Sequence, residues 1–199
     1  MKISKGDIKA AKMPAEDRGE AVPLMEPMII SAGSRHRGAL TDLVVELAAQ
    51  AAGFRRALPS GVVHALSGLV RSMNCYYSNL IEGHDTHPVD IERALKEDYS
   101  AEQQKRDLQL EARAHIAVQE WIDQGGLRGR ATAAAGLRET HERFCALLPE
   151  EMLWAENPET GAGLKVVPGA YRKSDVKVGR HVAISPGAVP RFLVRFEEV

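Results

Sequence analysis

The sequence has little of what defines several classes of protein. Only two of its 199 residues are cysteine, and only 5% are aromatic. No stretch approaches the roughly 18 apolar residues that a membrane span needs, and no apolar run follows Lys2 and Lys5 as it would in a signal peptide. The formal net charge is −1 without a basic block, which argues against nucleic acid or a membrane as partner. We therefore expect a soluble, cytoplasmic protein.

The two cysteines, Cys75 and Cys145, lie in separate helix-like segments. Isolated cysteines of this kind suit buried thiols in a reducing compartment better than a disulfide framework. With 44% hydrophobic and 27% charged residues, the chain has an ordinary globular composition and is long enough for one domain with a core.

Apolar residues spaced three and four apart predict a mainly α-helical bundle. The expected helices cover residues 39–52, 60–82, 88–99, 101–123 and 132–148, and a last helix begins at Val189. Gly53 is expected to end the first, and Gly83 fits the left-handed cap of the second. The stretch DVKVGRHVAI predicts one β-hairpin over residues 176–184, turning at Gly179. Residues 1–22 are polar and lack a period, so we expect a flexible N-terminal segment.

The last expected helix carries an apolar face up to the end of the sequence. No glycine, C-cap or polar tail follows this face, which consists of Val189, Phe192, Leu193, Phe196 and Val199. We interpret the pattern as a helix cut through its middle, so that residue 199 marks a truncation. A natural terminus is the alternative.

Few residues show the spacing of a catalytic or metal site. His84 and His87 form H-x-x-H, but no third ligand is near in sequence, so surface histidines are the better interpretation. His115 and His141 stand singly on long helices, where a partnered structural histidine is more common than a base. The stretch ETGAGLK lacks the spacing of a phosphate-binding loop and is expected to be a solvated turn.

Glu82 is unusual because it stands in the last turn of an expected helix. That end of a helix carries partial negative charge, and a carboxylate there costs roughly 0.3–1 kcal/mol at an exposed site. Residues 78–83, SNLIEG, fit the pattern [S/T]-x-x-x-E-[G/N], which resembles the inhibitory-helix motif of Fic proteins. Further segments of the sequence resemble segments of Fic proteins and occur in the order expected of that family's N-terminal half. They are GHDTHPVDIERAL, LRETHERFCALLP, PGAYRK, VKVGRHV and SPGAVPRFLVRFEEV. The resemblance covers about residues 24–199.

The resemblance implies a Fic-like fold and an inhibitory role for Ser78, Glu82 and Gly83. In family members whose inhibitory helix is N-terminal, the glutamate that matches Glu82 pairs with an arginine of the catalytic loop and blocks the productive pose of the ATP γ-phosphate. Ser78 and Glu82 are four residues apart and project from one helix face. A carboxylate in that place competes for the arginine through a bidentate, charge-assisted bond. An ordinary surface glutamate at a frayed helix end is the alternative.

The expected hairpin resembles the family's flap, which holds the target's modifiable side chain by β-strand addition. The resemblance assigns target contact to Val176, Lys177 and Val178, and a plain structural hairpin is the alternative. The family's catalytic consensus, H-P-F-x-[DE]-G-N-[GK]-R, is absent, since the sequence after His87-Pro88 departs from it. We therefore expect no catalytic residue, no metal ligand and no cofactor in this chain. ATP and Mg²⁺ belong to the intact family member.

The sequence thus predicts the N-terminal part of a Fic-type protein adenylyltransferase, inhibited through Glu82 and itself inactive. The expected division is a flexible segment over 1–22, a helical region over 23–125 with the inhibitory helix at about 60–83, and the first part of the Fic domain over 126–199. A protein substrate and a second copy of the chain are the candidate partners. The alternative is a regulatory or protein-binding module that acts on a separate chain, supported by an apolar groove around Phe192 and Phe196 if one exists.

Overall fold

The computed structural model describes residues 16–25, 29–156 and 161–198. The α-helices within these residues are α1 (Arg37–Ala57), α2 (Ser60–Ile81), α3 (Pro88–Leu95), α4 (Gln103–Asp123), α5 (Ala134–Ala146) and α6 (Val189–Glu198). Short 3₁₀ turns cover η1 (Val22–Met25), η2 (Glu150–Leu153) and η3 (Pro186–Ala188). Two antiparallel pairs join β1 (Trp154–Glu156) to β2 (Gly163–Lys165) and β3 (Lys177–Val178) to β4 (His181–Val182). The expected mainly α-helical fold and its hairpin are confirmed.

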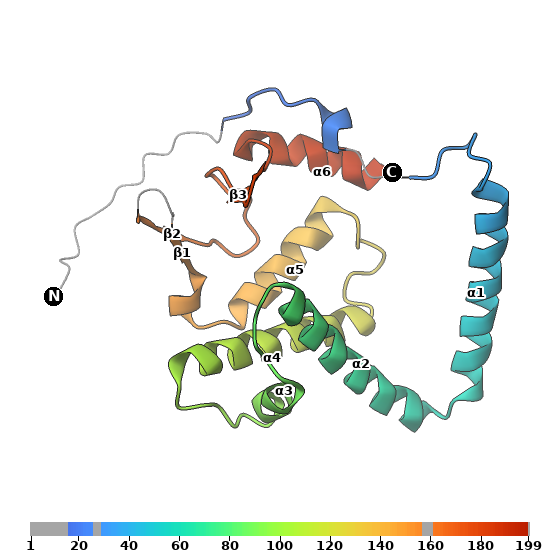
Figure 1. Cartoon of the computed structure of the whole chain (residues 1–199), viewed down its shortest axis with the longest axis horizontal. Helices are drawn as coiled ribbons and strands as arrows, with labels where there is room; N and C mark the ends of the chain where they lie inside the picture. The colour runs from blue at the N-terminus through green and yellow to red at the C-terminus, as the bar shows by residue number, and fades with distance from the viewer. Residues whose placement is uncertain (1–15, 26–28, 157–160, 199) are drawn as a thin grey trace.

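Helix α4 is the centre of the packing, and α2, α3 and α5 all pack against it (Figure 1). The core between α2, α3 and α4 consists of Cys75, Ile91, Ala112 and Ile116, with Tyr76 packed against it. Ala112 lets α2 approach α4 closely, so that Sγ of Cys75 lies 3.8 Å from the carbonyl oxygen of Ala112. The packing of α5 on α4 links the expected regions 23–125 and 126–199, and α6 packs in turn on α5.

A buried glutamine ties the loop between α3 and α4 to this core. Gln109 is only 1% exposed, and its side-chain oxygen accepts a hydrogen bond from the backbone N–H of Ser100 at 2.7 Å. Its amide nitrogen donates to the carbonyl oxygens of Asp90 and Asp98, each at 3.3 Å. One side chain therefore bonds two backbone groups of this connection, at Asp98 and Ser100, and one of α3, at Asp90.

Helix α1 differs from its expected bounds because Gly53 does not end it. The helix runs on to Ala57, and Leu58 is extended, with φ −91° and ψ 134°. Leu58 precedes Pro59, and the residue before a proline is disfavoured in the helical region. The proline therefore ends the helix.

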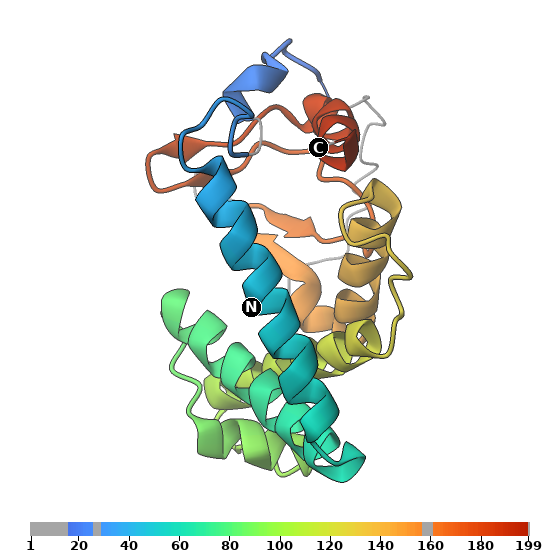
Figure 2. The ribbon, with the colours of Figure 1, turned by 90° about the vertical axis from the view of Figure 1, so that its right-hand side faces the viewer.

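Helix α1 buries none of its residues. It stands at one side of the molecule, apart from α4 and α5 (Figure 1), and Figure 2 shows it running in front of the remaining helices. Its exposed large apolar side chains are Leu40, Leu43, Val44, Val45, Leu47 and Phe54. A face this apolar and this exposed is typical of a contact surface.

Two further segments differ from the sequence-based expectation. The pair β1–β2 was not predicted, because three-residue strands are too short to show an alternating pattern. Residues 16–20 belong to the segment expected to be flexible, yet they form ion pairs with the region around β3, β4 and α6. The rest of that segment, residues 1–15, lies outside the described residues. No helix in the described part of the chain is long and apolar enough to cross a bilayer.

Candidate functional site at the end of helix α2

The C-terminus of α2 presents the three residues expected to be inhibitory. The backbone N–H of Glu82 donates to the carbonyl oxygen of Ser78 at 3.2 Å, so that both residues belong to the last turn. Gly83 follows with φ +79°, which confirms the predicted left-handed cap. The N–H of His84 then donates to the carbonyl oxygen of Asn79 at 2.8 Å. Glu82 therefore stands where a closed turn leaves its side chain exposed.

A buried polar contact fixes this turn. Asn79 is 4% exposed and Thr86 is 2% exposed, and the Asn79 side-chain amide donates to Oγ1 of Thr86 at 3.3 Å. The chain after Gly83 is thus folded back onto α2 before α3 begins at Pro88. Because both partners are buried, we expect the direction of the Glu82 backbone to be well defined rather than frayed.

A pocket of about 290 Å³ opens beside this turn, between α2 and α4. Helix α2 lines it with Ser78, Asn79, Ile81 and Glu82, and α4 lines it with Glu111 and His115. Ser78 and Glu82 are four residues apart on α2, and Glu111 and His115 are four residues apart on α4. Each of these pairs therefore lies on one face of its helix, and the two faces meet at the pocket. The two residues of α4 were not predicted, because nothing in the local sequence shows which helix faces α2.

The pocket is acidic. Burial lowers the pKa of His115, against the opposing effect of the Glu111 carboxylate, and the side-chain nitrogen of Gln119 lies 2.7 Å from Nε2 of His115. An amide nitrogen only donates, so the imidazole accepts at Nε2, which is consistent with a neutral ring. Nδ1 of His84 lies 3.7 Å from Oε1 of Glu111. Two carboxylates beside a neutral imidazole favour a cationic group and disfavour a phosphate.

The Glu82 carboxylate has no hydrogen bond or ion pair with any other residue in the described ranges. It is exposed at the negative end of a helix, where no internal cation offsets its charge. Both of its oxygens are therefore open to a donor from outside this part of the chain.

The expected flap forms a two-pair hairpin elsewhere on the fold, beside α6 (Figure 1). Lys177 pairs with Val182 and Val178 with His181, while Gly179 turns with φ +59°. The N–H of Ala183 donates to the carbonyl oxygen of Val176 at 2.9 Å. The side chain of Val178 lies outside the described part of the structure. Val176 and Lys177 are exposed, and in the described part of the chain β3 and β4 pair only with each other, so each strand has one unpaired edge.

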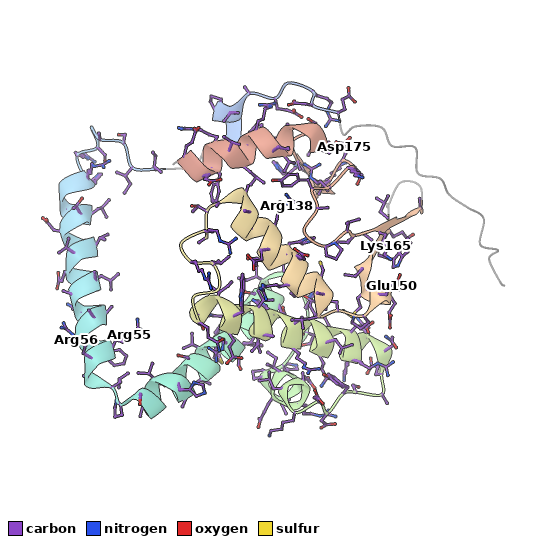
Figure 3. All side chains as sticks on the ribbon, turned by 180° about the vertical axis from the view of Figure 1, so that it is seen from behind. Arg55, Arg56, Arg138, Glu150, Lys165 and Asp175 are labelled. Atoms are coloured by element: carbon purple, nitrogen blue, oxygen red, sulfur yellow. The ribbon has the colours of Figure 1, made fainter. Side chains whose placement is uncertain are left out.

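The segment that leads into this hairpin is held by α5. Arg138 donates from Nε to the carbonyl oxygen of Gly169 at 2.6 Å, and its guanidinium lies 5.1 Å from the ring centre of Tyr171. The N–H of Gly169 donates to Nδ1 of His141 at 3.0 Å. Figure 3 labels Arg138 on α5. His141 is thus a partnered structural histidine, as predicted.

The remaining expectations concern histidines and thiols. The described residues contain no group of three or more His, Cys, Asp or Glu side chains that could hold a metal ion, and His87 instead pairs with Asp85 at 3.0 Å. Cys75 and Cys145 are free and buried, as expected. Burial raises the pKa of the Cys75 thiol to about 11 and also raises that of Cys145, so both sulfurs are protonated thiols at neutral pH.

A second, larger cavity of about 440 Å³ lies between the end of α1, the start of α2 and the end of α4. Arg71 lines it, and its guanidinium bonds Asp123 at 2.9 Å and lies 3.6 Å from Glu120. Because the two carboxylates already pair with this arginine, Arg71 is not free to bind a ligand, and Arg55, which also lines the cavity, is exposed to solvent. None of the residues expected to be functional lies there.

The comparisons with known proteins give no relative: no family model, no curated protein and no solved structure matches the chain.

Proposed function

We propose that this chain is the N-terminal part of a Fic-type protein adenylyltransferase, in which Glu82 restrains the transfer of AMP from Mg-ATP to a hydroxyl group of a target protein. The observation that supports the proposal most is the Glu82 carboxylate itself. It is exposed, lacks an ion-pair partner among the described residues and stands on a turn that the buried Asn79–Thr86 contact fixes. A frayed surface glutamate would not need such support.

The acidic pocket supports the same role. A guanidinium that bonds both oxygens of Glu82 would also lie near the Glu111 carboxylate, which favours the cation further. The inhibited state then consists of an arginine drawn toward α2 and away from a nucleotide phosphate. Release of this inhibition requires only that the Glu82 carboxylate moves away or loses its charge.

Glu82→Gln tests the proposal in the intact protein as its cells make it, incubated with Mg²⁺ and ATP labelled in the α-phosphate. Loss of the charged partner removes charge-assisted hydrogen bonds of about 1.5–3 kcal/mol, so we expect roughly 10- to 100-fold more labelled protein. The 199-residue chain alone should give no label with either residue at position 82, because the catalytic consensus is absent from it.

Glu151→Gln is the matched control. Glu151 is also exposed and has no ion-pair partner in the described part of the chain, and it lies in η2, away from the pocket. Equal labelling by the wild-type protein and Glu82→Gln, or equal stimulation by both variants, would contradict an inhibitory role for Glu82.

A second candidate function, a protein-binding module, is favoured by the exposed face of α1. Leu40, Val44, Leu47, Ala51 and Phe54 follow the alternating four- and three-residue spacing of a coiled-coil seam. When two copies of α1 run antiparallel about residue 49, Val44 meets Phe54 and Leu47 meets Ala51. The seam is therefore complementary to itself, and a second copy of the chain is the partner that it fits.

Leu47→Glu tests this module by sedimentation equilibrium at micromolar concentrations. We expect the mass of the wild-type chain to rise above 21.7 kDa with concentration and that of Leu47→Glu to remain at the monomer value, because a charge in the seam is not paired. Ala49→Glu, on the opposite side of α1, should associate like the wild type. A wild-type monomer at all concentrations would exclude the second copy as partner.

A further inference from the structure

The β3–β4 hairpin has little of its own to hold it in place. It consists of two residue pairs, and the described side chains of its strands, those of Lys177, His181 and Val182, are exposed. An isolated two-stranded hairpin is marginally stable at best in water. Its position must therefore depend on what holds its two ends.

Both ends are held by residues 16–20, which we call the N-terminal strap. Arg18 forms a two-pronged ion pair with Asp175, just before β3, with Nη1–Oδ2 at 2.9 Å and Nη2–Oδ1 at 2.8 Å. Glu20 accepts two hydrogen bonds from Ser185, just after β4: one from its backbone N–H and one from its hydroxyl group, both at 2.7 Å. Ser185 is fully buried. Figure 3 labels Asp175 at the base of the hairpin, next to α6.

The strap is itself anchored to α6 and η3. Arg191 of α6 donates to both oxygens of Asp17, at 2.8 and 3.0 Å, and these bonds contribute most to lowering the pKa of Asp17 to about 2. The N–H of Gly187 donates to the carbonyl oxygen of Glu16 at 2.9 Å. These contacts join residues more than 150 positions apart in sequence, and Figure 2 shows the blue segment that carries η1 next to α6.

We infer that Arg18 and Glu20 are positioning residues for the β3–β4 hairpin, and that the N-terminal strap sets how firmly its open edge is presented to an extended segment of a target protein. The target role rests on the proposed function, whereas the positioning rests on the contacts alone. Fixing residues 175 and 185 closes the ends of the loop that carries the hairpin, which lowers the entropy lost when a further strand pairs with it.

One exposed ion pair contributes little by itself, and Arg18 and Asp175 are both exposed. The strap differs because it combines two forked ion pairs with three hydrogen bonds to the buried Ser185. Charge reversal at Arg18 is the sharpest change, since it places a carboxylate against Asp175 while the backbone N–H of residue 18 still reaches Oγ of Ser185.

Amide hydrogen exchange of the full chain tests the inference, with peptides that cover residues 176–184 as the readout. In Arg18→Asp we expect these amides to exchange roughly tenfold faster, while amides of α4 keep their rates, because the hairpin opens locally. The double variant Arg18→Asp/Asp175→Arg restores the ion pair with reversed sign and should recover most of the protection. Arg55→Asp, an exposed arginine on α1 without an ion pair among the described residues, should leave the hairpin unchanged (Figure 3).

Unchanged hairpin exchange in Arg18→Asp would overturn the inference, and so would an acceleration that spreads equally over α4 or that the double variant does not reverse. No target and no nucleotide enter this experiment. If the adenylylation assay fails while hairpin exchange is slow and depends on the strap, only the proposed function is rejected. If the assay succeeds while hairpin exchange does not depend on the strap, only the inference about the strap is rejected.

Discussion

Replacing Gln109 by leucine should destabilise the protein by about 3 kcal/mol or more, although leucine is the more hydrophobic residue and a good helix former. The side chain of Gln109 satisfies the N–H of Ser100 and the carbonyl groups of Asp90 and Asp98. Leucine fills the same space and leaves these three backbone groups without their partner. Each unsatisfied buried group costs roughly 1–3 kcal/mol.

Urea denaturation followed by circular dichroism measures this effect, with Gln104→Leu as the matched control. Gln104 lies on the same helix but is exposed, so the same substitution there should change the free energy of unfolding by no more than about 0.5 kcal/mol. A Gln109→Leu protein as stable as the wild type would mean that water or a shift of the α3–α4 loop satisfies the three backbone groups.

The helices were predictable because their signal is local. The apolar period and the turn residues fixed the bounds of α2 to within one residue, and Gly83 adopts the positive φ that its cap position requires. The end of α1 was missed because two local signals compete there, and Pro59 prevails over Gly53. Glycine tolerates a helix at a modest cost, whereas proline restricts the residue before it.

The partners of the candidate site were not predictable from the sequence. Ser78 and Glu82 stand out by their motif and spacing, but Glu111 and His115 join them only through the packing of α4 on α2. The strap is a stronger case, because Asp17 and Arg191 are paired across almost the whole chain. A polar, aperiodic segment resembles a flexible one until the distant residues that bind it are known.

The other large effect is expected at Gly136, the third residue of α5, where a single methyl group should destabilise the protein by about 1–3 kcal/mol. Alanine is normally better than glycine inside a helix by roughly 0.5–1 kcal/mol. Here Gly136 is buried, and a Cβ atom at this position would overlap the carbonyl oxygen of Arg130 and lie 2.9 Å from its carbonyl carbon. The clash involves backbone, so rotation of a side chain cannot relieve it.

Gly68→Ala, in the middle of α2, is the matched control because a Cβ atom there meets nothing within 4 Å. We expect this variant to be more stable than the wild type by roughly 0.5–1 kcal/mol, so the two identical substitutions should shift the urea midpoint in opposite directions. The sign of the change in stability separates the effect of helix propensity from the effect of packing. A stabilised Gly136→Ala protein would mean that the loop before α5, held by the Arg130–Glu139 ion pair at 2.6 Å, moves away from the helix without loss.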